Sequence, residues 1–364
     1  MTVQNQALID RSRRIDIESC LKLRTDVAPA PIFDVVPGPV VKRVIDSNKQ
    51  QVFDAVETAY RLHDAGSTLN PASYFLRYPG NPNARIIALP AHLGGEVQKS
   101  GIKWISSFPE NRATNLARAS AVLILNDAST GYPLACLEAS LISATRTAAS
   151  AALAAENISP NPFEGTLAVI GTGIIARTTV EWLLFRKWKF RTIKLYDVDH
   201  HEADHFSKWL WDEFNVRADI QDGLEDATSD SSLILFTTTA LDPYLADKEL
   251  FAQCPTILHL SLRDICVNVI LASQNIVDDV DHCLKAKTSL HLTEMETGNR
   301  DFVSGSLVDV LEKRFKLDHQ RPRIFSPFGL GVLDVAVGSF VLEAAKSSGE
   351  AIELPDFFAN SARW

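Results

Sequence analysis

The sequence contains a glycine-rich turn of the kind that binds the phosphates of a nucleotide. Gly171, Gly173 and Ala176 form the pattern Gly-x-Gly-x-x-Ala after the apolar run TLAVI and at the start of a helix-like segment. The first glycine permits a tight turn, the second lets a pyrophosphate approach the main chain, and the alanine allows close helix-strand packing. The N-terminus of the following helix adds N–H groups and positive potential. The motif predicts a dinucleotide site; the alternative is a turn that only packs a strand on a helix.

An acid and a threonine run extend this motif. Asp197 ends a second apolar run, TIKLYD, about 26 residues after the first glycine, where a carboxylate can bind the ribose hydroxyls and repel the extra phosphate of NADP. NAD is therefore favoured over NADP. Thr237, Thr238 and Thr239 end the strand-like SSLILF, at the edge where open α/β sheets bind ligands. The alternative for these threonines is a polar strand end.

A set of cationic residues precedes the nucleotide motif and alternates with apolar residues. The set comprises Lys99, Lys103, Arg112, Arg118 and Arg146. Lys103 lies in the strand-like GIKWISSF and Arg146 interrupts the alanine-rich SATRTAAS, so some of these side chains should point inward. Buried cations need anionic partners, which are either a carboxylate substrate or structural ion pairs.

One acid follows the next buried run. Asp264 lies in LHLSLRDI, where a carboxylate can meet a ligand held by the glycine turn. The alternatives are a helix cap and a partner of Arg263. His259, in the same run, is expected to be a core residue with satisfied hydrogen bonds. The sequence contains no HExxH, GxSxG or P-loop pattern and no metal-ligand spacing of histidines, so hydrolase functions and a metal are not expected.

The surrounding elements predict two domains. The 364 residues exceed the roughly 250 to 300 over which one core grows. The first third contains strand-like FDVV, a helix over Val40 to Asp64 and a hairpin around residues 80–83. An alanine-rich helix over Leu137 to Ala155 should bridge to a βαβ unit with a parallel sheet. The segment FSPFGLGVLDVAVGSFVLEAAKSSG predicts an amphipathic helix that returns to the first domain.

The composition of the chain limits its possible binding partners and its cellular compartment. The net charge of −9 and pI near 5.5 argue against nucleic acid, because a phosphate-backbone binder needs excess Lys and Arg. Five cysteines without CxxC spacing predict neither a disulfide framework nor a zinc site and favour the cytoplasm. The first residues lack the apolar core of a signal peptide, and no later run reaches the roughly 18 apolar residues of a membrane span. Neither export nor membrane insertion is expected.

Four segments together resemble the ornithine cyclodeaminase and μ-crystallin family over nearly the whole chain: GIKWISSFP, NDASTGYPLACLEASLISATRTAASAALAA, GTGIIA and FSPFGLGVLDVAV. Within it, SYFLRYP, ARIIALPAHLGG, RASAVLILND, SLRDI, NIVDDVDH and SLHLTEMETGNRDF resemble the N-(2-amino-2-carboxyethyl)-L-glutamate dehydrogenases of siderophore and peptide-antibiotic biosynthesis. The resemblance implies an α/β fold in which a Rossmann-type, doubly wound NAD domain, residues 147–322, is inserted in an α+β domain. That second domain, residues 1–146 with 323–364, would bind substrate and form a homodimer.

The resemblance also implies roles for single residues. Lys103 corresponds to the active-site lysine, Arg146 to the carboxylate-binding arginine and Asp264 to the acid/base carboxylate. Around Asp264 this chain has SLRDICVN where cyclodeaminases have a glycine-rich loop, which argues against cyclisation of ornithine. The further expected substrate contacts are Arg77, Arg118 and Arg263. The expected cofactor contacts are Thr147, Gly171, Thr172, Gly173, Ile174, Ile175, Asp197, Thr237, Thr238, Thr239, Ser261 and Leu262.

The reaction that the resemblance implies is an NAD-dependent oxidation of a secondary amine, followed by hydrolysis of the imine to 2-oxoglutarate and 2,3-diaminopropionate. Its substrate carries three carboxylates, a demand that the cationic set meets. Three alternatives stay open: a cyclodeaminase or related amino-acid lyase, a non-catalytic ligand binder of the μ-crystallin kind, and a relative of imine reductases or alanine dehydrogenase.

Overall fold

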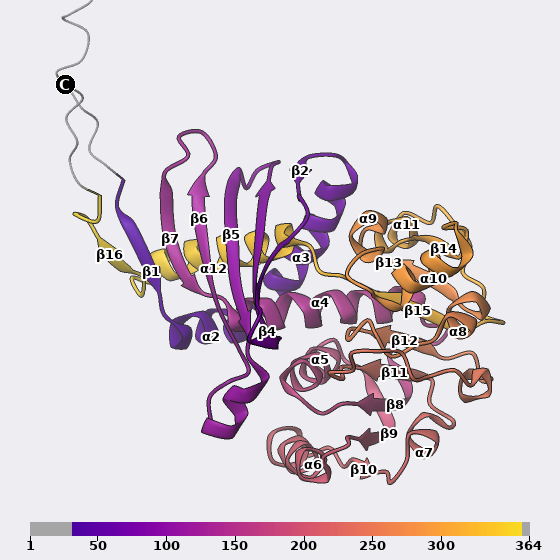
Figure 1. The fold of residues 1–364 in the computed structure, drawn as a ribbon. Helices are drawn as coiled ribbons and strands as arrows, with labels where there is room; N and C mark the ends of the chain where they lie inside the picture. The colour runs from indigo at the N-terminus through magenta and orange to yellow at the C-terminus, as the bar shows by residue number, and fades with distance from the viewer. Residues whose placement is uncertain (1–30, 359–364) are drawn as a thin grey trace, which may run out of the picture.

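The computed structural model describes residues 31–358, which form two eight-stranded sheets (Figure 1). The residues before 31, including the start of the expected first domain and Cys20, lie outside this range. The first sheet has the strand order β16-β1-β7-β6-β5-β4-β2, with β3 paired to β4. Its strands are β1 (Phe33–Val36), β2 (Thr68–Leu69), β3 (Tyr74–Tyr78), β4 (Asn81–Leu93), β5 (Lys99–Ser107), β6 (Ala119–Asp127), β7 (Pro133–Glu138) and β16 (Ile352–Leu354).

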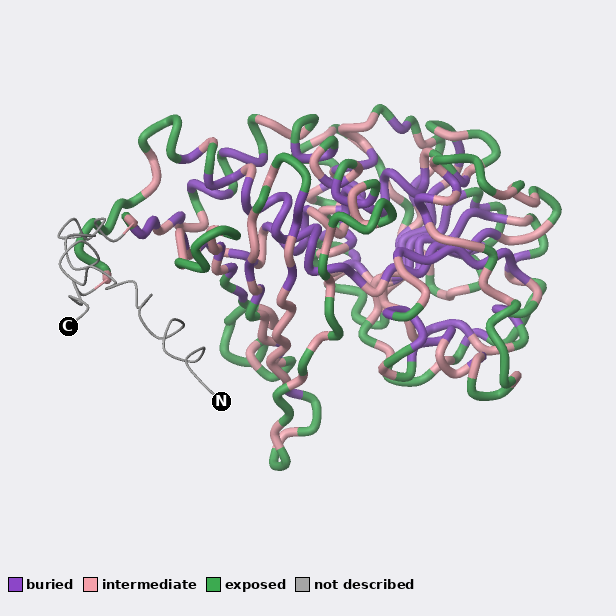
Figure 2. The backbone as a smooth tube through the Cα atoms, turned by 90° about the horizontal axis from the view of Figure 1, so that it is seen from above, coloured by how far each residue is buried: buried purple, intermediate pink, exposed green. Residues whose placement is uncertain are grey.

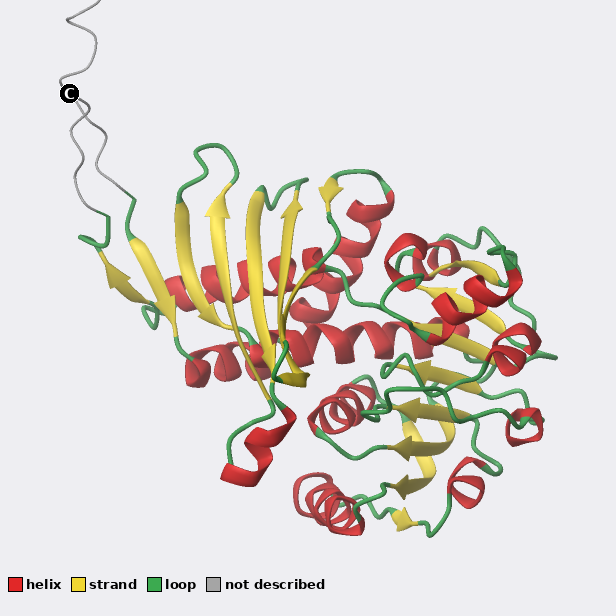
Figure 3. Cartoon of the chain, viewed as in Figure 1, coloured by secondary structure: helices red, strands yellow, loops and turns green. Residues whose placement is uncertain are grey.

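Helices cover one face of the first sheet and leave the other open (Figure 3). They are α2 (Gly38–Ser47), α3 (Lys49–Asp64), α4 (Ser140–Ile158) and α12 (Gly331–Ser347). The strands follow the alternation of a half-buried sheet: Lys103 and Leu123 are buried beneath the helices, whereas Trp104 and Val122 on the other face are exposed. A 3-10 helix, η1 (Pro109–Thr114), connects β5 to β6.

The second sheet is parallel throughout, with the order β10-β9-β8-β11-β12-β15-β13-β14. Its strands are β8 (Glu164–Ile170), β9 (Lys189–Tyr196), β10 (Asp219–Ile220), β11 (Leu233–Phe236), β12 (Thr256–His259), β13 (Gln274–Val277), β14 (Val303–Ser306) and β15 (Arg323–Ser326). The central strands β11 and β12 are buried at every residue, as expected for a sheet covered on both faces. The expected Rossmann-type parallel sheet is therefore confirmed.

Short and medium helices connect the strands of this second sheet. They are α5 (Ile174–Phe185), α6 (His200–Phe214), α7 (Leu224–Thr228), η2 (Lys248–Phe251), α8 (Val267–Ala272), α9 (Val280–Cys283), α10 (Ser289–Thr297) and α11 (Leu307–Leu311). The strand-turn-helix-strand unit β8-α5-β9 coincides with the predicted βαβ unit. Figure 2 shows the buried backbone concentrated in the two sheets and the helices between them.

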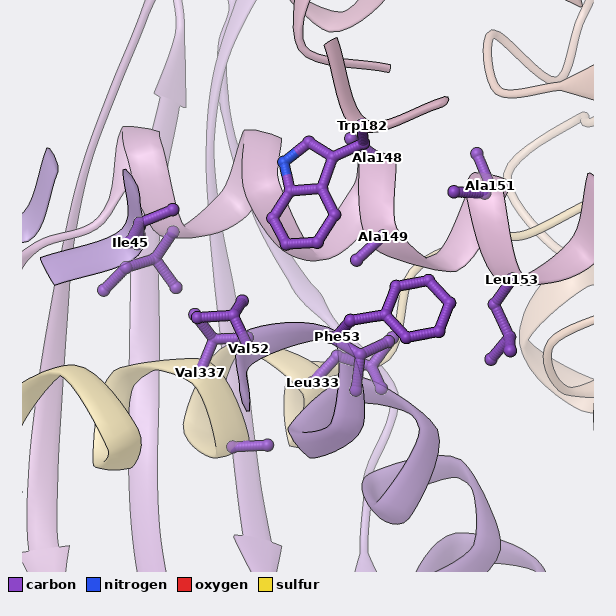
Figure 4. Packing of buried hydrophobic residues seen from close by; sticks show 14 of the residues in the cluster. Ile45, Val52, Phe53, Ala148, Ala149, Ala151, Leu153, Trp182, Leu333 and Val337 are labelled. Carbon is purple, nitrogen blue, oxygen red and sulfur yellow. The ribbon is translucent and has the colours of Figure 1, made fainter. Parts of the chain in front are cut away.

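The alanine-rich helix α4 joins the two sheets, as expected. It contacts β6 of the first sheet and β12 and β15 of the second, and Figure 1 shows it extending from one to the other. Its small side chains allow close approach of neighbouring helices. The residues labelled in this region are Ile45 of α2, Val52 and Phe53 of α3, Ala148, Ala149, Ala151 and Leu153 of α4, Trp182 of α5, and Leu333 and Val337 of α12 (Figure 4). One hydrophobic cluster therefore extends through both halves, and a second cluster lies within the half that contains the parallel sheet.

The structure differs from three expectations. The predicted helix over Val40 to Asp64 is two helices, because Asn48 leaves helical geometry (φ −134°, ψ 34°) and its side-chain amide donates to the carbonyl of Val44. The strand β15 pairs with β12 and β13, so the chain leaves the second sheet after Ser326 and not at residue 323. The helix α12 is buried along most of its surface, so it is not amphipathic. The hairpin around residues 80–83 is confirmed, with Tyr78 paired to Asn81.

Candidate active site

The glycine turn between β8 and α5 has the shape that a dinucleotide requires. Gly171 has φ +85°, and a Cβ there would lie 3.0 Å from the backbone of Thr237, so a side chain would collide with the end of β11. No atom lies within 4 Å of the position that a Cβ on Gly173 would take, which leaves its main chain open to a ligand. Ile174, the first residue of α5, is exposed at the same end. The helix N-terminus thus offers free N–H groups beside an open backbone.

Two predicted cofactor residues hold the turn in this shape. The carboxylate Oδ2 of Asp197 accepts hydrogen bonds from the main-chain N–H (2.7 Å) and the hydroxyl (2.9 Å) of Thr172. The hydroxyl of Thr237 donates to the carbonyl of Gly171 at 2.6 Å. The carboxylate that should meet the ribose is therefore tied to the phosphate-binding turn, and the end of β11 to the end of β8. These contacts hold the turn in the open shape that fits a dinucleotide.

Asp264 is the centre of a second polar cluster, just beyond β12. It is fully buried, and its carboxylate accepts from the hydroxyls of Thr238 and Ser261, from Tyr244 at 3.2 Å, and faces His259 Nε2 at 3.1 Å. Burial acts to raise the pKa of Asp264, but the hydrogen bonds and the charge of His259 outweigh burial and place the pKa below its ordinary value. Asp264 is therefore an ionised acceptor at neutral pH.

The partners of Asp264 extend both inward and outward. His259 is buried with both ring nitrogens in contact, since Nδ1 faces Ser326 Oγ at 3.2 Å, which agrees with the expected core histidine. Tyr244 donates its hydroxyl to the buried carboxylate of Asp264, although the residue as a whole is 47% exposed. Burial and the adjacent Asp264 raise the pKa of Tyr244, which keeps the phenol protonated. Arg263 donates to the carbonyl of Ala286 at 2.9 Å and forms no ion pair with Asp264.

Lys103 and Arg146 share one buried acid on α12. Lys103 Nζ lies 2.7 Å from Asp334 Oδ2 and 2.9 Å from Ser143 Oγ, while Arg146 Nε lies 3.3 Å from Asp334 Oδ1. Lys103 and Asp334 are each at most 1% exposed. Burial lowers the pKa of Lys103 to about 8, against the opposing effect of the Asp334 charge. The fold therefore places a lysine that titrates close to neutral pH beside an arginine.

Most of the Arg146 guanidinium is left for another partner. Within residues 31–358, its two terminal nitrogens form no hydrogen bond. They lie against Gly329, which has φ +96° and where a Cβ would be 2.5 Å from Nη1. The main-chain N–H of Gly329 donates to Asp278 Oδ2 at 2.6 Å, which fixes this loop after β15. Two parallel donors in this position can bind a carboxylate in bidentate fashion.

The structure thus divides the predicted residues into groups. Lys103 and Arg146 meet at Asp334, whereas Asp264 meets Thr238 and Ser261, and no hydrogen bond or ion pair within residues 31–358 joins the two groups. The remaining predicted residues are dispersed. Thr147 donates to the carbonyl of Ser143, Leu262 has φ +68°, Ile175 lies in α5 and Thr239 follows β11. Arg77 lies on β3 of the first sheet, and Arg118 precedes β6 and donates to Ser107 Oγ of β5.

Sequence reasoning missed Asp334, the acid that unites the cationic residues. A signal was present, because GVLDVAV places one acid inside an apolar helix, and a buried acid requires a cationic partner. Within residues 31–358 no group of three or more His, Cys, Asp or Glu side chains is arranged to hold a metal ion. In the same range no helix is long and apolar enough to cross a membrane.

Comparisons with known proteins define the class. The family model "Ornithine cyclodeaminase/mu-crystallin family" matches residues 40–260, and the chain belongs to this family. The chain is 28% identical over 309 residues to N-((2S)-2-amino-2-carboxyethyl)-L-glutamate dehydrogenase of Staphylococcus aureus, which covers 82% of this chain and 91% of that protein.

Solved structures share the fold. Δ(1)-pyrroline-2-carboxylate reductase of Thermococcus litoralis, in complex with NADH and L-proline, has a TM-score of 0.81 at 21% identity and covers 88% of this chain and 100% of its own. An archaeal alanine dehydrogenase dimer with bound NAD has a TM-score of 0.79 at 24% identity and covers 90% and 100%. These likenesses confirm the expected fold, in which a Rossmann-type sheet is combined with a second sheet.

Proposed function

We propose that this chain is an NAD-dependent dehydrogenase that oxidises N-(2-amino-2-carboxyethyl)-L-glutamate and releases 2-oxoglutarate and L-2,3-diaminopropionate. The observation that carries the proposal is the excess of cationic groups on the face of the first sheet that bears Lys103. Within residues 31–358, the terminal guanidinium nitrogens of Arg146 form no hydrogen bond, and Arg77, Arg85 and Arg118 at the same sheet form no ion pair with an acid. Such a site suits a substrate with several carboxylates.

The residues of the glycine turn would hold the cofactor. Gly171 and Gly173 leave the backbone open, the N-terminus of α5 offers N–H groups, and Asp197 offers a carboxylate to the ribose. The same carboxylate disfavours NADP, which carries an additional phosphate there. NAD, when bound, supplies the hydride acceptor for oxidation of the substrate amine.

The substrate is held by cationic side chains. Arg146 would bind the α-carboxylate beside the reacting carbon through its two free nitrogens, while its Nε stays on Asp334. Lys103, whose pKa is about 8, lies next to it and can exchange a proton near neutral pH. Positioning of this kind can contribute several kcal/mol to lowering the barrier, roughly 7 to 11 in favourable cases.

Asp264 is the proposed proton acceptor. Loss of a hydride and a proton converts the secondary amine to an imine, which water attacks, and the C–N bond then breaks to give the keto acid and the free diamine. Asp264, ionised at neutral pH, accepts a proton from the amine or the attacking water, a role typically worth about 10² to 10⁴ in rate. Tyr244 donates a hydrogen bond to this carboxylate at 3.2 Å and would help to hold it in position.

The proposal includes a homodimer. The face of the first sheet opposite Lys103 bears exposed apolar residues in one cross-strand neighbourhood: Tyr74, Leu76, Trp104 and Val122. A second copy of the same face would bury them, and the archaeal alanine dehydrogenase described above is a dimer. Four free cysteines in residues 31–358 suit the reducing cytoplasm, where we place the enzyme. The diaminopropionate would serve siderophore or peptide-antibiotic biosynthesis.

One experiment tests the function directly. Purified protein is incubated with NAD and N-(2-amino-2-carboxyethyl)-L-glutamate, and NADH and 2-oxoglutarate are followed together. We expect both to accumulate in equal amounts. Ornithine conversion without net NADH would instead indicate a cyclodeaminase, and NADH consumption with pyruvate and ammonia, or with Δ(1)-pyrroline-2-carboxylate, would indicate a reductase. Either result without oxidation of the glutamate derivative contradicts the proposal, as does nucleotide binding without any turnover.

The role of Asp264 is tested by Asp264→Asn. Turnover should fall by about 10² or more, because an amide cannot accept the proton, while the affinity for NAD stays near that of the wild type. Because Asp264 is buried among four partners, its melting temperature is compared with that of Tyr244→Phe, which removes one of them. Near-normal turnover in a folded Asp264→Asn protein would refute the assignment.

A further inference from the structure

Arginine side chains gather at the end of β5 that lies away from Lys99. We call this group the arginine subsite, and it consists of Arg77 on β3, Arg85 on β4, Arg118 before β6 and Arg263 after β12. Within residues 31–358, none of the four forms an ion pair with an acid. The hydrogen bonds they do make are to neutral groups, Arg118 to Ser107 Oγ at 2.8 Å and Arg263 to a main-chain carbonyl.

The strand register places Arg77 and Arg85 in one row with Ser107. Arg77 pairs with Arg85 across β3 and β4, and Arg85 pairs with Ser107 across β4 and β5. Directly paired residues point to the same side of a sheet, so both arginines share the side of Ser107, which is buried. Arg118 reaches this side through its bond to Ser107.

The row lies on the same face as the proposed catalytic lysine. Lys103 and Ser107 are four residues apart on β5, so their side chains point the same way. At the strand rise of about 3.3 Å per residue, they are about 13 Å apart along the sheet. A ligand as small as alanine or proline cannot span this distance, whereas an extended molecule with carboxylates at both ends can approach both, given the length of the arginine side chains.

The electrostatics of the row are unfavourable without an anion. Burial lowers the pKa of Arg85, and the charges of Arg263, Arg118 and Arg77 lower it further. Burial and the charge of Arg77 likewise lower the pKa of Arg263, which comes from the second sheet. Half-buried like charges that repel one another are stabilised when an anion binds among them.

We propose that the arginine subsite binds the distal carboxylate of the substrate, and that Arg85 is a specificity-determining residue that selects polycarboxylates over simple amino acids. The assignment to the substrate rests on the proposed function. A carboxylate chain is favoured over a second protein copy as the occupant, because these arginines share the face of Lys103, whereas the exposed apolar row that would contact a second copy is on the opposite face.

The test measures binding and catalysis separately. The variants Arg85→Gln and Arg85→Lys are compared with the wild type and with Arg191→Gln, an exposed arginine on β9 that serves as a matched control. Tricarballylate is the probe, and its affinity is measured by calorimetry with NADH present, together with the KM for the glutamate derivative. We expect Arg85→Gln to weaken the binding of tricarballylate and to raise the KM for the glutamate derivative, each by about tenfold or more. Arg85→Lys should have an affinity and a KM between those of the wild type and Arg85→Gln, because an ammonium keeps the charge but lacks the planar fork of a guanidinium. Arg191→Gln should match the wild type in both quantities.

The outcomes distinguish this inference from the proposed function. Tricarballylate binding that depends on Arg85, without turnover of the glutamate derivative, supports the subsite and rejects the proposed substrate. Turnover with an unchanged KM in Arg85→Gln rejects the subsite and leaves the function standing. Unchanged tricarballylate affinity also rejects the subsite, and so does a change in oligomeric state in Arg85→Gln, because the arginines would then pair with another copy. If Arg85→Gln fails to fold, the exposed Arg77→Gln provides the same measurements.

Discussion

Two cationic regions lie on one face of the first sheet and differ in how their charge is balanced. Around Lys103, the fold supplies its own counter-ion, since α12 inserts Asp334 between the lysine and Arg146. Around Arg85, whose strand partner Ser107 lies four residues beyond Lys103 on β5, the described residues supply none. Buried or half-buried charge is costly without a partner, so the unbalanced charge of the second region would be stabilised by a bound anion. The comparison separates a region whose charge is balanced within the fold from a region whose charge, under the proposal above, is balanced by the substrate.

The largest expected effect comes from removing the internal counter-ion. Asp334→Asn leaves Lys103 and Arg146 without a negative partner in a buried environment, and loss of one member of a buried ion pair typically costs about 3 to 5 kcal/mol. The free energy of unfolding is measured in urea. Glu350→Gln, which breaks an exposed pair with Arg43, is the control and should change stability little. A small effect of Asp334→Asn would mean that the first region is not balanced by this acid.

An intermediate effect is expected from adding a counter-ion to the unbalanced region. Ser107→Asp places a carboxylate beside Arg85 and Arg118, where charge-assisted hydrogen bonds should outweigh desolvation and stabilise the fold by about 1 kcal/mol. It should also abolish tricarballylate binding, because the subsite would already hold an anion. Ser106→Asp adds the same charge on the opposite face, where Ser106 contacts Ser120, and serves as the control. Destabilisation by Ser107→Asp alone would contradict the assigned imbalance.

The two regions also differ in what could be predicted from the sequence. The glycine turn, the parallel sheet and the bridging helix were predictable, because Gly171, Ala176 and the alanine run act through neighbours a few residues away. Lys103 and Arg146 were recognised by their apolar surroundings and their family resemblance. What joins them was not predicted, because Asp334 is 231 residues from Lys103 and only the packing of α12 on β5 brings them together.

Other features depended on tertiary pairing in the same way. The position of Arg85 beside Arg77 and Ser107 follows from the strand register, which no local sequence pattern specifies. The strand β15 lies in the second sheet because β12 and β13 accept it on either side, although the segment precedes a helix of the first half. The break at Asn48 was hidden because the apolar period continues across it, and only the side-chain bond to Val44 marks the end of α2.

The smallest expected effect concerns a contact between the two halves of the molecule, in which an ion pair depends on the protonation of a histidine. Asp279, at the start of α9, lies 3.2 Å from His63 of α3 and 2.9 Å from His282 Nδ1, so it links the two halves of the molecule. The bond to Asp279 raises the pKa of His282 above its ordinary value, against the effect of burial. A group with a raised pKa contributes stability fully below its unfolded pKa, about 6.5, and loses it as the pH rises through the folded pKa.

His282→Gln should therefore cost more stability at pH 6 than at pH 9, by roughly 1 kcal/mol or less. Contacts that do not depend on charge, such as that with Asn70, are lost equally at pH 6 and pH 9. The difference between the stability losses at the two pH values therefore measures the ion pair alone. The unfolding free energies of wild type and variant are compared at each pH, with the exposed His205→Gln as control. A cost that stays constant, or that grows with pH, would show that Asp279 is balanced by neutral donors and that it forms no ion pair with His282.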